Sequence, residues 1–231
     1  NNISNINGIL GVNGAANLFL INPKGIIFGA GSSLDIQGSF IGSTADSINF
    51  SDGSIFSAVE LNNPALLTIN VPLGLLYGNN PAPIQLQQAN LQVETGKTLS
   101  LIGGNISLDD STLKAPGGTV QLAGLRSPGT VNLNDLQSFT FPINATLGDI
   151  SLTNKSRIDV MDGGGGNIFV DARNFSLNNS DLEAGIEKRA GNNNAVSGDI
   201  IINSTANTNI LDYSEINNIL ASNSLGNSGK I

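Results

Sequence analysis

The side chains with the clearest capacity for chemistry are the adjacent carboxylates of Asp109 and Asp110, which follow a short apolar segment. Two carboxylates at a suitable separation can act as acid and base, or as acid and nucleophile, in cleaving a glycosidic bond. Asp159 and Asp171 are further candidate acids. The chain has no His and no Cys, which excludes a Ser-His-Asp triad, a Cys nucleophile and the usual zinc site. Because Asp109 and Asp110 follow a strand doublet, we interpret them as turn residues, and we expect no enzyme, no cofactor and no metal.

The composition favours many short strands joined by tight turns. Charged residues make up only 12% of the 231 residues, aromatic residues 5%, and 28 residues are Gly. Gly and the abundant Asn tolerate the positive φ that tight turns require. The net charge is −8 and the basic residues are scattered along the chain, so no nucleic-acid partner is expected. No apolar run approaches the length of about 20 residues that a membrane helix needs.

Short apolar doublets recur along the middle of the chain, and their spacing predicts strands. The first residues of successive doublets advance by seven or eight positions: Ile84/Leu86, Leu91/Val93, Leu99/Leu101, Ile106/Leu108, Leu113/Ala115 and Val120/Leu122. Apolar residues two positions apart indicate a strand with one buried face. A helical heptad pattern is disfavoured, because the spacers contain Gly, Pro and Asp rather than helix formers.

Strands this short and regular suit either an antiparallel sandwich or a parallel β-helix. Strand starts share a small motif of Gly, one polar residue and a β-branched residue. It begins at Gly104, Gly118, Gly129, Gly148, Gly166, Gly198 and Gly229. Equivalent corners that stack on one another explain this similarity, whereas the strands of a sandwich have different surroundings. The sequence therefore predicts an all-β parallel β-helix with three strands per rung of about 21 residues.

Asn22, Pro23, Gly25 and Ile26 belong to the segment "NPKGIIFG", which separates two apolar segments. Asn at the first position, Pro at the second and Gly at the fourth fit a type I β-turn. In that turn the Asn side chain can accept a hydrogen bond from the backbone ahead, and Pro presets φ. On residue chemistry alone, a purely structural turn is a complete interpretation.

Two stretches depart from the period. The proline-containing stretch 58–83 is expected to be an extra-helical insertion, a hairpin or small sheet packed on the helix, and the polar stretch 187–197 a corner loop. A solenoid accepts insertions at its turns without disturbing the stack. We expect residues 1–231 to form a single β-helical domain. Because the chain does not begin with Met and its last residues open a new rung, it is expected to be part of a longer protein.

The segments "ANLFLINPKGIIFG", "LDIQGSFIGSTADSINFSDG" and "LLTINVPLGLLYG" resemble the N-terminal secretion domain of two-partner-secretion exoproteins, the filamentous haemagglutinin family, in its cyanobacterial style. The family carries an Asn-Pro-Asn-Gly-Ile motif. Here Asn22, Pro23, Gly25 and Ile26 match this motif and Lys24 departs from it. The resemblance covers roughly residues 1–125, and the later rungs match as generic β-helix.

This resemblance implies a right-handed parallel β-helix with extra-helical strands. It implies a secretion-directing domain of a large exoprotein or adhesin, recognised by the periplasmic domains of an outer-membrane TpsB-type transporter. Asn22, Pro23, Gly25 and Ile26 are the candidate recognition residues. The protein is then secreted to, or held at, the surface of a Gram-negative-type bacterium after crossing the periplasm.

Two alternatives remain open. The chain could be a structural, adhesive or filament-forming β-solenoid, with glycans of a host or neighbouring cell as partners, or with self-association through open solenoid ends. It could also be a β-helix enzyme acting on polysaccharides. Dependence on a transporter distinguishes secretion from the first alternative, and turnover of an acidic polysaccharide would support the second.

Overall fold

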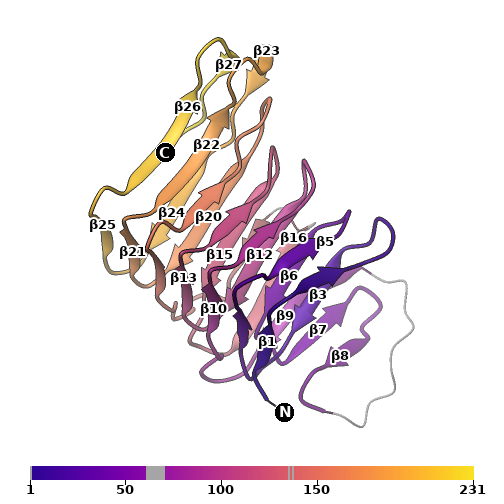
Figure 1. The fold of residues 1–231 in the computed structure, drawn as a ribbon. Coiled ribbons are helices and arrows are strands. Elements are labelled where there is room, and N and C mark those ends of the chain that lie inside the picture. Colours follow the sequence, from indigo (N-terminus) through magenta and orange to yellow (C-terminus); the bar gives the residue numbers. More distant parts are fainter. Residues whose placement is uncertain (1, 61–70, 135, 137) are drawn as a thin grey trace.

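The computed structural model describes residues 2–60, 71–134, 136 and 138–231. These residues form strands, turns and irregular segments, and they contain no helix that could cross a membrane. The chain winds repeatedly around one axis, so that the N-terminus and the last rungs lie at opposite ends of an elongated stack (Figure 1). The expected all-β parallel β-helix is confirmed.

Three parallel sheets form the sides of the helix. Sheet I consists of β1 (Ser4–Ile6), β4 (Ile26–Phe28), β10 (Ile84–Gln87), β13 (Ile106–Asp109), β18 (Ile150–Thr153), β21 (Phe175–Asn178) and β25 (Thr208–Leu211). Sheet II consists of the pair β2 (Ile9–Gly11) and β5 (Ser33–Asp35), followed by β11 (Asn90–Gln92), β14 (Thr112–Lys114), β19 (Arg157–Asp159), β22 (Asp181–Ile186) and β26 (Glu215–Leu220). Sheet III consists of β3 (Leu18–Ile21), β6 (Phe40–Ser43), β12 (Thr98–Gly103), β15 (Thr119–Gly124), β20 (Asn167–Ala172) and β24 (Ile200–Ser204).

Successive rungs lie in register, so equivalent residues stack in columns. Ile84 pairs with Ile106, which pairs with Ile150, and Ile150 pairs with Phe175. These four side chains are at most 1% exposed and point into the common core. A rung measured in sheet I from Ile84 to Ile106 spans 22 residues. The apolar doublets of the sequence therefore mark the inward-facing positions.

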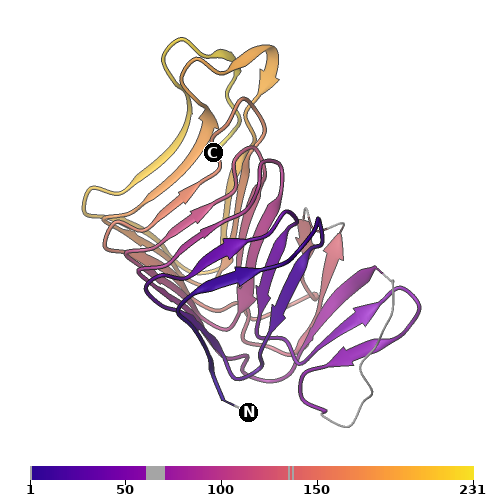
Figure 2. The ribbon, with the colours of Figure 1, turned by 45° about the vertical axis from the view of Figure 1, so that its right-hand side comes forward.

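An antiparallel sheet lies outside the helix, against sheet III (Figure 2). Its strands, in spatial order, are β17 (Ser138–Thr140), β16 (Gly129–Asn134), β9 (Pro72–Tyr77), β7 (Ser47–Phe50) and β8 (Ile55–Ser57). Its inner face and the outer face of sheet III enclose a second apolar cluster that includes Ile41, Leu75 and Ile102. Strands β6, β12 and β15 of sheet III thus have buried apolar side chains on both faces.

The outer sheet draws on two separate parts of the chain. Strands β7, β8 and β9 leave the helix between β6 and β10, whereas β16 and β17 leave it between β15 and β18. The second excursion was missed in the sequence, because the Gly129 motif matches the motif that starts rungs. In the structure Gly129 pairs antiparallel with Tyr77 of β9, so its motif starts an outer strand.

The expected extra-helical insertion 58–83 contains β9 and the segment leading back to β10. Residues 61–70, which include part of the apolar segment that begins at Leu66, lie outside the described residues. The bounds of this insertion stay a prediction.

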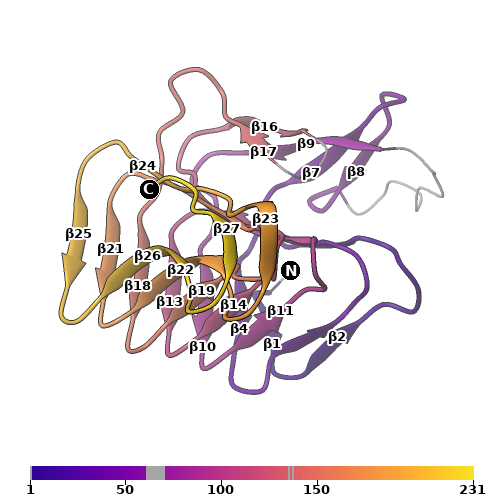
Figure 3. The same ribbon diagram turned by 90° about the horizontal axis from the view of Figure 1, so that it is seen from above.

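In the range 187–197, expected to be a corner loop, the structure places β23 (Gly191–Val196). This strand pairs in parallel with β27 (Leu225–Asn227) of the following rung. The polar extension therefore obtains backbone partners from the next turn of the chain. Figure 3, seen from above, shows β23 and β27 side by side beyond the corner between sheets II and III.

Candidate functional site

The segment 22–25 forms the turn between β3 and β4. The Gly25 N–H donates to the Asn22 carbonyl at 3.0 Å, and the Lys24 N–H donates to Asn22 Oδ1 at 2.9 Å. The first bond closes a four-residue β-turn and the second is the side-chain bond that an Asn at the first position makes. Lys24 does not have a positive φ, which excludes a type II turn and agrees with the type I turn expected from the sequence.

The amide of Asn22 also connects this turn to the N-terminal strand. Its Nδ2 donates to the Asn2 carbonyl at 2.9 Å and to Ser4 Oγ at 2.8 Å. The Ser4 N–H in turn donates to the Gly25 carbonyl at 3.1 Å. The Asn22 amide nitrogen therefore joins the N-terminal segment to the turn, while its oxygen accepts within the turn.

Gly25 and Ile26 lie inside the stack. Gly25 has φ of +110°, and a Cβ at this position would lie 3.1 Å from the Pro83 carbonyl oxygen of the next rung. Ile26 is fully buried, and its N–H donates to the same Pro83 carbonyl at 3.3 Å. Lys24, the residue that departs from the family motif, is the exposed member of the turn. The matching residues therefore shape the first rungs in the folded state.

Tyr77 connects the outer sheet to the helix. Its hydroxyl lies 2.7 Å from Ser43 Oγ of β6 and donates to the Ile102 carbonyl of β12 at 3.0 Å. The side chain is 2% exposed, and its burial raises the pKa of the phenol far above its ordinary range, so the hydroxyl stays protonated. The sequence did not identify this contact, because its two partners lie 34 and 25 residues away.

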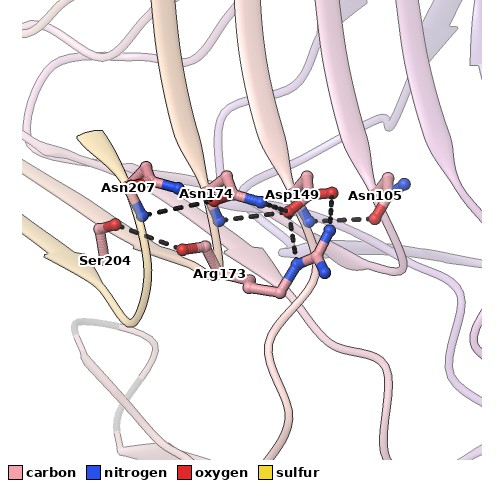
Figure 4. A network of polar contacts seen from close by, with 6 residues as sticks. All are labelled: Asn105, Asp149, Arg173, Asn174, Ser204 and Asn207. Atoms are coloured by element: carbon pink, nitrogen blue, oxygen red, sulfur yellow. Dashed lines mark hydrogen bonds and ion pairs between the residues drawn. The ribbon is translucent and has the colours of Figure 1, made fainter. Parts of the chain in front are cut away.

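A polar ladder runs along the corner between sheets III and I (Figure 4). The Asp149 N–H donates to Asn105 Oδ1 at 3.0 Å, and the Asn174 N–H and Nδ2 donate to Asp149 Oδ1 at 3.2 and 2.8 Å. Asn207 repeats the arrangement on Asn174 Oδ1. Each rung thus donates to the side chain of the preceding rung, which fixes the register of the stack.

Arg173 adds charge to this ladder. Its Nε and one terminal nitrogen donate to the two carboxylate oxygens of Asp149 at 2.9 and 2.6 Å. Mainly through this bidentate contact, and with help from Asn174, the pKa of Asp149 falls to about 2. The Asp149 carboxylate is therefore charged at neutral pH and acts as the acceptor that holds two rungs together.

Buried serines form a ladder at the corner between sheets I and II. The Ala89 N–H donates to Ser111 Oγ, the Ser111 N–H to Ser156 Oγ, and the Ser180 N–H to Ser214 Oγ, each at 3.1 Å. Ser111 and Ser156 are at most 1% exposed. These hydroxyls supply acceptors to corner N–H groups that the strand ladders leave free.

The four candidate acids lie at three separate places on the helix. Asp109 and Asp110 lie at the corner after β13, whereas Asp159 lies on the outer face of sheet II, with its carboxylate 3.4 Å from both Lys114 Nζ and an Arg157 terminal nitrogen. Asp171 belongs to β20 of sheet III and accepts from Asn203 at 2.9 Å. Burial raises the pKa of Asp171. Asp109 and Asp110 thus share one corner, whereas Asp159 and Asp171 lie on two other sides of the helix, so the four acids are not gathered in one site.

A parallel β-helix with an outer antiparallel sheet and an Asn-Pro-x-Gly-Ile turn in its first rungs defines the class of β-helical export domains of exoproteins. The family model described as "TPS secretion domain" matches residues 1–170, which extend from the first rung into β20. The chain belongs to this family.

As a TPS secretion domain, the chain directs the secretion of a TpsA-type exoprotein that a TpsB transporter recognises. Two-partner secretion exports the protein to the cell surface or the extracellular space. Searches of curated proteins and of solved structures returned no match.

Proposed function

We propose that the TpsB transporter reads the segment Asn22, Pro23, Gly25 and Ile26 before the first rungs fold. The observation that supports this proposal is the engagement of Asn22: its amide contacts Asn2, Ser4 and the Lys24 N–H. A transporter that used the same amide would have to compete with β1. In the unfolded chain the amide and the backbone of this segment are free.

Recognition of an unfolded segment fits pairing between extended strands. Backbone hydrogen bonds supply affinity in strand addition, and side chains at alternate positions supply specificity. The segment that follows the turn, β4, has a fully buried Ile26 and Phe28 in the folded state. Folding therefore removes the determinants from the transporter and makes release of the bound segment favourable.

A binding measurement tests this order of events. The periplasmic domains of the transporter are mixed either with the protein freshly diluted from denaturant or with the folded protein, and binding is followed by biolayer interferometry. We expect binding to the freshly diluted chain and little binding to the folded one. Equal binding to both states would contradict the proposal.

Two variants separate recognition from folding. Asn22→Ala removes the amide that the transporter is proposed to read, whereas Ser4→Ala removes only a folded-state partner of that amide. We expect Asn22→Ala to weaken binding to the unfolded chain and Ser4→Ala to leave it unchanged. If both variants bind as the natural sequence does, Asn22 contributes only to folding, which contradicts the proposal that the transporter recognises it.

We also propose that the route crosses the periplasm of a Gram-negative-type bacterium and that the exported protein attaches to glycans. Self-association is a further proposal, supported by the apolar side chains that β25, β26 and β27 expose. These are Ile210, Leu211, Ile219, Leu220 and Leu225, each 42 to 55% exposed. Sedimentation velocity over a range of concentrations tests it. A monomer at every concentration would count against self-association.

A further inference from the structure

The corner between sheets I and II carries a column of residues in the left-handed conformation. They are Gln88, Asp110, Asn154, Lys155, Asn179, Asp212 and Tyr213, with φ between 44° and 68°. Such φ values are unusual for residues other than Gly, Asn and Asp, and for a bulky aromatic residue they are exceptional. The corners stack along the lower-left border of Figure 3.

A surface groove follows this corner over several rungs. It has a volume of about 560 Å³ and is lined by Gln87, Gln88, Asp109, Asp110, Asn154, Lys155 and Asn179. The lining therefore combines two carboxylates, one ammonium and several amides on a rigid, repetitive backbone. Among the described residues, no group of three or more His, Cys, Asp or Glu side chains is placed to hold a metal ion.

Most polar side chains of this groove lack a hydrogen-bond partner within the part of the protein that the structure describes, unlike those at the corner between sheets III and I. There Asn105, Asp149 and Asn174 use their side chains to bind the next rung. In the groove, Asp109 Oδ1 accepts from Asn154 Nδ2 at 2.6 Å, whereas the side chains of Asp110, Gln88, Lys155 and Asn179 make no hydrogen bond or ion pair with other described residues. Their donors and acceptors are available to a ligand.

Two corners project beyond the others. The turns after β18 and β25 contain one residue more than the turn after β21, so Lys155 and Tyr213 extend on either side of Asn179. The Lys155 N–H donates to the Asn179 carbonyl at 2.6 Å, and the Asn179 N–H donates to the Leu211 carbonyl at 3.2 Å, which places the three corners on successive rungs. Tyr213 is 96% exposed. An aromatic ring that is not used in the core lies at one end of a row of free polar groups.

We propose that this corner binds a neutral polysaccharide chain that lies along the stacking direction. The ring of Tyr213 offers an apolar surface to one face of a sugar, and carboxylates and amides at successive rungs offer acceptors and donors to hydroxyl groups. A charged polymer fits less well. Asp109, Asp110 and the net charge of −8 repel an acidic chain, and Lys155 opposes a basic one.

This site differs from the segment Asn22–Ile26 in position and in chemistry. We therefore expect that a substitution in the groove leaves secretion unchanged and that a substitution in the segment leaves sugar binding unchanged. Residues 22–26 lie in the turn between sheets III and I and in the first part of β4, among the first rungs. The groove begins at Gln87 in a later rung and lies at a different corner. Secretion could therefore fail while sugar binding persists, and the reverse also holds.

Affinity electrophoresis of the folded protein tests the proposal, in native gels that contain amylose, galactomannan, β-glucan, xylan or polygalacturonate. We expect one of the four neutral polymers to retard the protein and polygalacturonate not to retard it. Titration with the matching hexasaccharide, followed by isothermal calorimetry, then gives the affinity. No retardation by any neutral polymer overturns the proposal, as does retardation by polygalacturonate alone.

Substitutions to Asn keep the left-handed conformation and thereby separate binding from folding. Tyr213→Asn, Asp110→Asn and Lys155→Asn each remove one contact, and we expect Tyr213→Asn to weaken binding about tenfold. Arg189→Asn is the matched control, because Arg189 is also cationic, exposed and left-handed but lies outside the groove. Binding that Tyr213→Asn and Asp110→Asn leave unchanged, or that requires calcium and is abolished by a chelator, would refute the assignment.

Discussion

At the scale of single residues, the polar side chains of this domain act mainly between rungs. Asn22 joins the turn after β3 to β1, and Asp149 joins two rungs at another corner. Hydrogen bonds of this kind contribute modestly one by one, and their geometry fixes which rungs stack. Each such residue can be tested by removing a single contact.

Replacement of Asn22 by Ala removes three hydrogen bonds from a half-buried position. We expect the free energy of unfolding to fall by about 1–2 kcal/mol, because the solvent can replace part of what is lost. Urea unfolding followed by circular dichroism measures this change. Lys24→Ala, in the same turn but exposed, should stay within about 0.5 kcal/mol of the natural sequence. An equal effect of both substitutions would contradict the structural role of Asn22.

The charge on Asp149 makes the stability of the domain depend on pH in acid. Its contact with Arg173 lowers the pKa of Asp149 from 3.8 to about 2 in the folded state. The resulting stabilisation is complete above the pKa of the unfolded chain and is lost as the pH falls from about 4 to about 2. We therefore expect the urea midpoints of the natural protein and of Asp149→Asn to converge over this interval.

Asn is a suitable replacement at position 149, because Asn105, Asn174 and Asn207 occupy the same column. It keeps the ladder and removes only the titrating group. A difference between the two proteins that stays constant from pH 5 to pH 2 would show that the Arg173 contact does not affect stability.

At the scale of elements, the outer sheet depends on a few contacts with the helix. Tyr77→Phe removes the hydroxyl that contacts Ser43 and the Ile102 carbonyl in a buried interface. We expect the free energy of unfolding to fall by about 1–2 kcal/mol. Relative to the natural protein, hydrogen exchange should accelerate more in β9 and β16 than in the core sheets. Tyr213→Phe is the control, since its hydroxyl is exposed and its removal should have little effect. Unchanged exchange in β9 would mean that apolar packing alone holds the outer sheet.

The serine ladder gives a second test at this scale. Ser156→Ala leaves the buried N–H of Ser111 without its acceptor, and we expect a loss of about 1–3 kcal/mol. Ser151→Ala, on the outer face of the adjacent strand β18, makes no such contact and should be close to neutral. Chemical unfolding of both variants distinguishes the outcomes. A neutral Ser156→Ala would indicate that water replaces the hydroxyl.

The elements of the core could be predicted from the sequence because their signal is local. The apolar doublets, such as Ile106/Leu108, lie two residues apart and face inward throughout the stack. Contacts between distant segments carry no such signal. The partnership of Asn22 with Ser4 becomes visible only when the two are placed one rung apart, and β16 begins with the same Gly motif as a rung strand. The turn could be predicted, whereas its partners and the second excursion could not.

At the scale of the whole molecule, the β-helix serves as a secretion domain and as an ordered surface. Residues 1–170 carry the family match, and the remaining rungs continue the same three sheets. Apolar columns run through the stack, so each rung that folds buries the inward face of the preceding one. Burial of apolar surface stabilises the stack by about 25 cal/mol per Å², and we propose that folding at the cell surface gives export its direction.

The most direct test of the central claim is the release of this domain into the medium. The domain is directed to the periplasm by a fused signal peptide, with and without the TpsB transporter, and the medium and periplasm are compared by immunoblotting. We predict release only when the transporter is present. Equal release in its absence would contradict a secretion function and leave a structural or adhesive solenoid as the explanation.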